Sequence, residues 1–151
     1  MKTSLSFLFI AGSLICVFSC KKNNNQAPTI PVSHWTINGV ADSGSNASAA
    51  NNINFVCLTN DQLKSISVNF YSTVVQSSTY KVSDVLNNST ECTISVNDGD
   101  SLIYTSEGLV SDSLYENFSN NIITLTFNNI TVHSKTSTTL VSGVLSFQSV
   151  Y

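Results

Sequence analysis

The sequence contains no arginine, and charged residues of all kinds make up only 10% of its 151 positions. From residue 34 onward, three lysines accompany nine acidic residues, which gives this part of the chain a net charge of −6. A nucleic-acid surface needs clustered Lys or Arg side chains to neutralise phosphates. The composition therefore excludes nucleic acid as a partner.

Histidine is also scarce, since only His34 and His133 occur, near opposite ends of residues 34–151. Nucleophilic catalysis needs a base beside the nucleophile, and no Gly-x-Ser-x-Gly motif is present. A zinc site needs three or four converging ligands, which two histidines and scattered cysteines do not provide. We therefore expect both histidines on strand faces or ends, with no catalytic residue, no metal and no cofactor.

Only one long, mostly apolar segment is present, residues 5–18, and a bilayer crossing needs about 20 apolar residues. Lys2 precedes this segment and the small residue Ser19 follows it, a pattern typical of a secretory signal peptide. Because the exit reads Val17-Phe18-Ser19-Cys20, the segment resembles a bacterial lipoprotein signal with its lipobox. The resemblance implies removal of residues 1–19 and lipidation of Cys20. An ordinary cleaved signal and an uncleaved anchor remain the alternatives.

Proline is confined to positions 28 and 31, within an asparagine-rich stretch that has no apolar periodicity. Residues 20–33 are therefore expected to form the lipidated cysteine and an extended, flexible tether. Residues 34–151 then remain for a single domain, which is long enough to bury a core of its own.

Two of the four cysteines, Cys16 and Cys20, belong to the signal and its exit. Cys57 and Cys92 remain as one candidate disulfide in an oxidising compartment. The alternative is two buried free thiols on separate strands, which behave as small apolar residues.

Short alternating segments, each bounded by turn residues, dominate the rest of the chain. Strands are expected over residues 34–37, 54–59, 64–72, 79–82, 91–96, 102–105, 122–132 and 139–150. Asn38-Gly39 predicts a hairpin turn, and a change of parity at Asn128-Asn129 predicts a β-bulge. Residues 40–50 form either a short strand or a loop, and residues 108–118 fit neither period. Eight to ten short strands predict an all-β antiparallel sandwich or barrel-like fold.

Three short motifs suggest a group of related proteins. They are Ser19-Cys20-Lys21-Lys22, Trp35-Thr36-Ile37-Asn38-Gly39 and Val141-Ser142-Gly143-Val144-Leu145-Ser146-Phe147. On these motifs the chain resembles small lipoproteins of Bacteroidota-type bacteria, which share an aromatic-x-x-Asn-Gly opening strand and a closing Ser-Gly-x-Leu-x-Phe strand. The resemblance implies an all-β domain in the cell envelope and implies no reaction.

The same resemblance suggests a location. In such lipoproteins an Asp directly after the lipidated cysteine causes retention at the inner membrane. Lys21 occupies that position here, so the outer membrane is expected. Residues 21–25 lack acidic side chains, which favours the periplasmic face over the cell surface. The expected partners are the membrane itself, through the anchor, and an envelope protein or glycan.

Two tripeptides, Asp100-Ser101-Leu102 and Asp112-Ser113-Leu114, are similar to the O-glycosylation acceptor of these bacteria. The resemblance implies that Ser101 and Ser113 are acceptors. Chance is the alternative in a chain so rich in serine.

One expected turn contains three side chains with oxygen atoms that could bind a cation, those of Asn97, Asp98 and Asp100. Their oxygens suit calcium, which takes six to eight oxygen ligands. Asn, Asp and Gly are also the residues that a tight turn requires, and we favour this second interpretation.

The expected function is a non-catalytic binding or structural module of the envelope. Such a module should expose an apolar or aromatic patch. One alternative is a small hydrolase, which requires two or more carboxylates in one pocket; another is an inhibitor or immunity-type lipoprotein. Among the aromatic residues, Trp35 is expected to fill the core rather than to bind a glycan.

Overall fold

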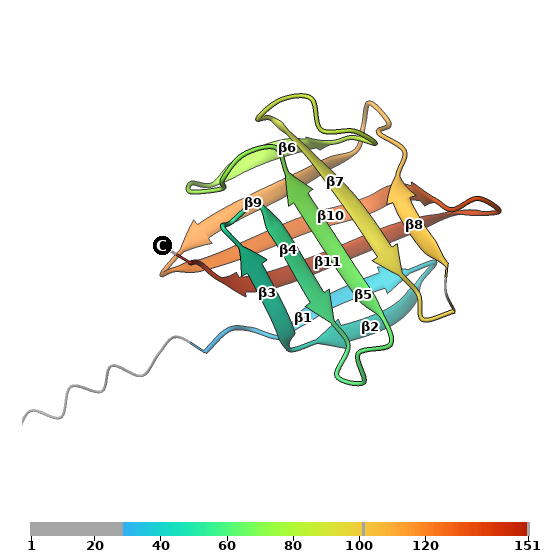
Figure 1. The fold of residues 1–151 in the computed structure, drawn as a ribbon, viewed down its shortest axis with the longest axis horizontal. Coiled ribbons are helices and arrows are strands. Elements are labelled where there is room, and N and C mark those ends of the chain that lie inside the picture. The colour runs from blue at the N-terminus through green and yellow to red at the C-terminus, as the bar shows by residue number, and fades with distance from the viewer. Residues whose placement is uncertain (1–28, 101, 151) are drawn as a thin grey trace, which may run out of the picture.

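A computed structural model describes residues 29–100 and 102–150 of the protein, apart from the side chains of residues 46–48. Signal residues 1–19, Cys20, Ser101 and Tyr151 lie outside the described residues. The described part confirms the all-β class, with eleven strands and no helix (Figure 1). The strands are β1 (Ser33–Ile37), β2 (Val40–Gly44), β3 (Asn46–Ala50), β4 (Asn54–Leu58), β5 (Ser65–Phe70), β6 (Ser78–Val82), β7 (Glu91–Asn97), β8 (Ile103–Ser106), β9 (Ser113–Ser119), β10 (Ile122–His133) and β11 (Thr138–Gln148).

The strands form one sheet in the order β2-β1-β11-β10-β9-β6-β7-β5-β4-β3. The sheet folds over on itself, so that β3, β4, β5 and β7 lie across β1, β10 and β11 (Figure 1). At one end β6 joins β9 to β7, and at the other end β8 joins β10 to β7. All pairs are antiparallel except β6 with β7, which run parallel over two residues.

The two backbone irregularities expected from the sequence are present. Asn38 and Gly39 have φ angles of 50° and 77° and turn β1 into β2, because both residues tolerate positive φ. In β10 the register with β11 shifts between Phe127 and Ile130, and Asn129 has a φ of 52°. The bulge lets β10 pair with β9 before it and with β8 after it.

Two segments differ from the simplest expectation. Residues 40–50 form two strands, β2 and β3, rather than one strand or a loop. Residues 113–119 form β9. Their apolar pattern is irregular because the charged residue Glu116 occupies an inward position, two residues after the buried Leu114 and opposite the buried Leu125 of β10. Together these additions give eleven strands, one more than the eight to ten expected.

The core lies between the two layers and is rich in phenylalanine. The rings of Phe55 on β4 and Phe147 on β11 meet across the layers at 5.0 Å, and Phe55 also contacts Phe70 at 5.5 Å. Tyr80 extends this row, at 4.6 Å from Phe70. Trp35 is 2% exposed and packs in the same cluster, which confirms that it fills the core.

One buried asparagine ties the β3–β4 turn to the end of the chain. Asn52 is fully buried with a φ of 50°. Its side-chain amide donates to the carbonyl of Val74 at 3.3 Å, and its oxygen accepts from the amide of Val150 at 3.3 Å. These bonds satisfy backbone groups that no strand pairs, which keeps this end of the sandwich closed.

Candidate functional site

A polar cavity of about 340 Å³ opens at the end of the sandwich where four turns meet. The turns β1–β2, β4–β5, β7–β8 and β10–β11 surround it. Its charged lining residues are Asp42, Lys64, Asp98 and Asp100. Tyr104 and Ser137 add hydroxyl groups, and the Ser137 hydroxyl donates to that of Tyr104 at 3.2 Å. Three carboxylates and one ammonium make the lining net negative, so it suits neutral or cationic groups better than anions.

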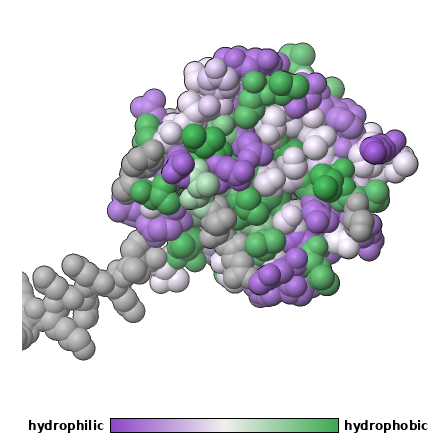
Figure 2. Space-filling view, in the orientation of Figure 1, coloured by the Kyte–Doolittle hydropathy of each residue, from purple (hydrophilic) through white to green (hydrophobic). Residues whose placement is uncertain are grey.

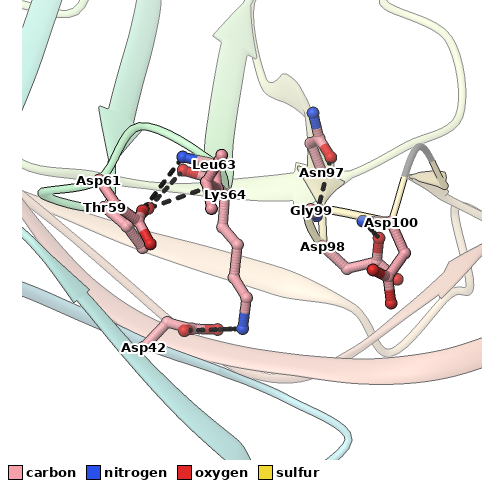
Figure 3. Close-up of polar contacts among 9 residues, drawn as sticks. All are labelled: Asp42, Thr59, Asp61, Leu63, Lys64, Asn97, Asp98, Gly99 and Asp100. Carbon is pink, nitrogen blue, oxygen red and sulfur yellow. Dashed lines mark hydrogen bonds and ion pairs between the residues drawn. The ribbon is translucent and has the colours of Figure 1, made fainter.

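The cavity contains an ion pair that joins the two layers (Figure 3). Lys64 Nζ lies 3.0 Å and 3.2 Å from the two carboxylate oxygens of Asp42. Asp42 belongs to β2 and Lys64 immediately precedes β5. Because the Lys64 side chain is about one third exposed, water weakens the attraction, and we expect the pair to stabilise the fold by about 1 kcal/mol or less.

A neighbouring turn holds Lys64 in place. The hydroxyl of Thr59 accepts from the Lys64 amide at 3.1 Å and donates to the carboxylate of Asp61. Asp61 also accepts from the amide of Leu63 at 3.1 Å. These hydrogen bonds lower the pKa of Asp61, and the one from the Thr59 hydroxyl has the largest effect. Asp61 therefore shapes the β4–β5 turn, and it is not among the residues that line the cavity.

The β7–β8 turn uses the three candidate calcium ligands as turn residues (Figure 3). Asn97 Oδ1 accepts from the Gly99 amide at 3.0 Å, and Asp98 Oδ1 accepts from the Asp100 amide at 3.0 Å. Among the described residues, no three His, Cys, Asp or Glu side chains are grouped as metal ligands. The side-chain oxygens of Asn97 and Asp98 therefore accept hydrogen bonds within the turn itself, a role that Asn and Asp often have in tight turns.

The structure gives both candidate disulfide cysteines as free, buried thiols. Cys57 is paired with Ile66 of β5, and Cys92 with Phe70 of the same strand. They therefore lie on opposite sides of β5 and four residues apart along it, so their Cα atoms are roughly 16 Å apart. A disulfide requires less than about 7 Å, so this arrangement corresponds to the second alternative, two separate thiols.

Burial also makes the two thiols unreactive. It raises the pKa of Cys92 to about 12 and raises that of Cys57 as well. The thiolate is the reactive form of cysteine, so neither residue suits nucleophilic chemistry at neutral pH.

The two candidate glycosylation sites cannot be treated alike, because Ser101 lies outside the described residues. Ser113 is exposed at the first position of β9. The other two residues of the tripeptide are buried. Asp112 is 6% exposed and accepts a hydrogen bond from the Thr131 amide at 3.2 Å, and Leu114 is fully buried. In the folded domain only the serine of this tripeptide is accessible.

The two histidines lie on different strands and do not form a pair. His34 is exposed on β1, and His133 Nδ1 lies 3.7 Å from Glu107 Oε1 at the end of β10. Of the aromatic residues, Tyr80 and Tyr104 are buried, whereas Tyr71 and Tyr115 are about half exposed. Tyr71 directly follows β5 and Tyr115 lies on β9, and neither lines the cavity.

Two adjoining loops carry exposed apolar residues that the sequence patterns did not single out. We call Val85, Leu109 and Val110 the apolar loop tip; Val110 is 96% exposed, and the other two are about half exposed. The loops touch, because a Cβ on Gly108 would lie 2.9 Å from the amide nitrogen of Asp84. Apolar side chains reach the surface among polar ones on the face shown in Figure 2.

A second concave surface lies on the outer side of the β1–β11–β10 layer. It is a mainly apolar groove of about 430 Å³ that passes over Gly143 between His34, Val144 and Thr126. A Cβ on Gly143 would lie 2.8 Å from the Phe127 ring and 3.1 Å from Trp35 Cβ, so this glycine faces the core and only its backbone lines the groove.

The structure brings together residues that are far apart in the sequence. Asp42 and Lys64 are 22 positions apart and join the β7–β8 turn in one cavity lining. Glu116 is fully buried with no hydrogen bond to either carboxylate oxygen. Its inward position could have been found by extending the alternation of Leu114 through β9.

No helix in residues 29–100 or 102–150 is long and apolar enough to cross a membrane. Comparisons of the chain with protein-family models, with curated proteins and with solved structures found no match.

Proposed function

We propose that the protein is a lipid-anchored, non-catalytic binding or structural module of the bacterial cell envelope. The observation that carries the proposal is the exit Val17-Phe18-Ser19-Cys20 at the end of the apolar segment. The expected tether then leads into β1, which begins at Ser33, one residue before the expected start of the domain. The anchor is at the outer membrane, and the periplasmic face is favoured.

The apolar loop tip supports a binding role over a purely structural one. Val110 is almost completely exposed, which costs solvation free energy unless a partner covers it. Asp84 and Glu107, in the same two loops, add negative charge, and no lysine occurs between residues 82 and 132. The partner is therefore an envelope protein or glycan whose surface does not repel an acidic, apolar loop pair.

A small hydrolase is the second candidate, because Asp42, Asp98 and Asp100 line one cavity. The same cavity argues against catalysis, since Lys64 neutralises Asp42 and Asp98 is engaged in the turn. Paired-carboxylate hydrolysis needs one carboxylate free to accept a proton and a second held as an acid. If the hydrolase candidate is correct, Asp100→Asn should abolish release of reducing sugar from envelope glycans.

The anchor is tested by Cys20→Ser. We expect metabolic labelling with a radioactive fatty acid to be lost and the protein to leave the membrane fraction. Cys16→Ser is the matched control, because the same substitution four residues earlier falls within the removed signal and should leave both results unchanged. Fatty-acid labelling that persists in Cys20→Ser would contradict the proposal.

The binding surface is tested by Val110→Asp in the anchored protein. We expect cross-linking in intact envelopes to lose at least about 90% of a specific partner adduct, because the charge places an unpaired carboxylate in the contact. Val144→Asp is the control, since Val144 is 45% exposed on another face beside the apolar groove. If only Val144→Asp loses the adduct, the groove is the binding surface and not the loop tip.

A further inference from the structure

Glu116 is a fully buried carboxylic acid in the middle of β9. Its cross-strand neighbours are Ser78 on β6 and Leu125 on β10. Neither carboxylate oxygen has a hydrogen-bond partner, and the nearby Ser78 amide favours the ionised form without forming a hydrogen bond. A carboxylate without partners in such a place is costly, since burial removes its water.

The elements around Glu116 offer it no cation. The titratable group coupled to it is the Tyr80 phenol on β6, whose pKa is raised first by burial and then by the charges of Glu116 and of Cys92 on β7. Lys81, next to Tyr80, is exposed on the other side of β6. Glu91 on β7 instead accepts from the Asn87 amide at 2.8 Å. No titratable group of β10 acts on Glu116, whose partner there is Leu125.

These surroundings favour the neutral acid. Burial raises the pKa of Glu116 from 4.5 to about 7, and the backbone of Ser78 opposes this with a lesser, lowering effect. The side chain is therefore protonated in mildly acidic solution and ionises near neutral pH. An opened state, in which water reaches the carboxylate, would have an ordinary pKa.

Glu116 lies at one of the two narrow connections between the layers; the other is β8, which pairs with β10 over two residues and with β7 over three. β6 pairs with β9 over four residues, from Ser78 to Lys81, and with β7 over only two. By comparison, β10 and β11 pair over ten residues.

We propose that Glu116 is a proton-dependent switch for the pairing of β6 with β9. Protonated Glu116 keeps the pair closed. When it releases its proton to water, the carboxylate turns toward solvent and β6 separates from β9. Separation frees the backbone groups of the β9 edge, which can then pair with another strand. The switch does not depend on the lipid anchor.

The direction of the effect follows from the two pKa values. The closed state binds the proton more tightly than the open state, so opening becomes more favourable as pH rises from about 4.5 to about 7. Between pH 5 and pH 8 the opening equilibrium should shift roughly 50-fold toward the open state.

Hydrogen exchange on the full-length protein in detergent micelles tests the switch. After correction for the intrinsic pH dependence of exchange, peptides that cover β6 and β9 should lose roughly 50-fold in protection between pH 5 and pH 8. Peptides that cover β4 and β5 should change little. Glu116→Gln should abolish the pH dependence, and Glu107→Gln, the same change at a partly exposed site, should keep it.

Three results would overturn the proposal. The first is equal protection of β6 and β9 at both pH values in the unmodified protein. The second is an unaltered pH dependence in Glu116→Gln, or in Glu116→Met if the glutamine variant does not fold. The third is a loss of protection in β4 and β5 equal to that in β6 and β9, because the whole domain would then be unfolding.

Discussion

Replacement of Gly44 by alanine should prevent the domain from folding or destabilise it by about 4 kcal/mol or more. A Cβ at this position would lie 2.0 Å from the backbone oxygen of Leu58 and 3.0 Å from Cys57 Sγ. Here the end of β2 meets the backbone of β4, and neither backbone can move without loss of strand pairing. Most domains are stable by only about 5–15 kcal/mol, so one such collision is decisive.

The free energy of unfolding of the Gly44→Ala variant is measured by chemical denaturation. Two other glycines provide graded controls. Gly39→Ala meets no atom within 4 Å but keeps a φ of 77°, which should cost about 1–2 kcal/mol. Gly143→Ala meets the end of the Phe127 ring at 2.8 Å, and a side chain can shift, so the cost should be about 1–3 kcal/mol. A Gly44→Ala variant as stable as Gly39→Ala would show that β2 does not approach β4 as described.

The free energy of unfolding should fall by roughly 3 kcal/mol as pH rises from about 4.5 to above 7, through Glu116 alone. The folded pKa of about 7 exceeds the unfolded value of 4.5, so the folded state binds more protons between these values. The contribution is complete below pH 4.5 and lost as pH rises through 7. The difference between the unmodified protein and Glu116→Gln isolates this effect from the other acids.

Urea denaturation at pH 5 and pH 8 measures this contribution of Glu116 to the free energy of unfolding. Glu116→Gln should be more stable than the unmodified protein at pH 8 by roughly 2–3 kcal/mol, because it removes the ionised form while it keeps the side-chain volume. Glu107→Gln, whose side chain is one third exposed, should change stability by less than about 1 kcal/mol at both values. If Glu116→Gln were less stable than the unmodified protein at pH 8, an unrecognised cation would have to pair with Glu116.

Local chemistry makes several features of the fold predictable from the sequence. Asn38-Gly39 requires positive φ at two successive positions, which few other dipeptides tolerate. The shift of buried residues from Phe127 to Ile130 is visible as a change of parity, because side chains alternate along a strand. Trp35 in the core and the all-β class follow from the same local patterns.

The candidate site is not predictable in this way. Asp42 and Lys64 each look like a solitary surface charge in the sequence, and only the approach of β2 to the β4–β5 turn pairs them. The two cysteines of a candidate disulfide lie on opposite sides of β5, which their spacing could not show. Glu116 interrupts the apolar alternation of β9, so the sequence does not indicate a strand there. The structure forms one because β9 pairs with β10 on one side and with β6 on the other.

Strand periodicity, the turns, the bulge and the lipoprotein-like exit at Cys20 are all encoded locally, because each depends on residues that are neighbours in the chain. Three other features exist only in the folded molecule: β1 lies beside β11, β6 runs parallel to β7, and four turns enclose one polar cavity. Backbone hydrogen bonds are alike for every pair of strands, so they do not select which strands become neighbours. The packing of side chains that are distant in the sequence makes that selection.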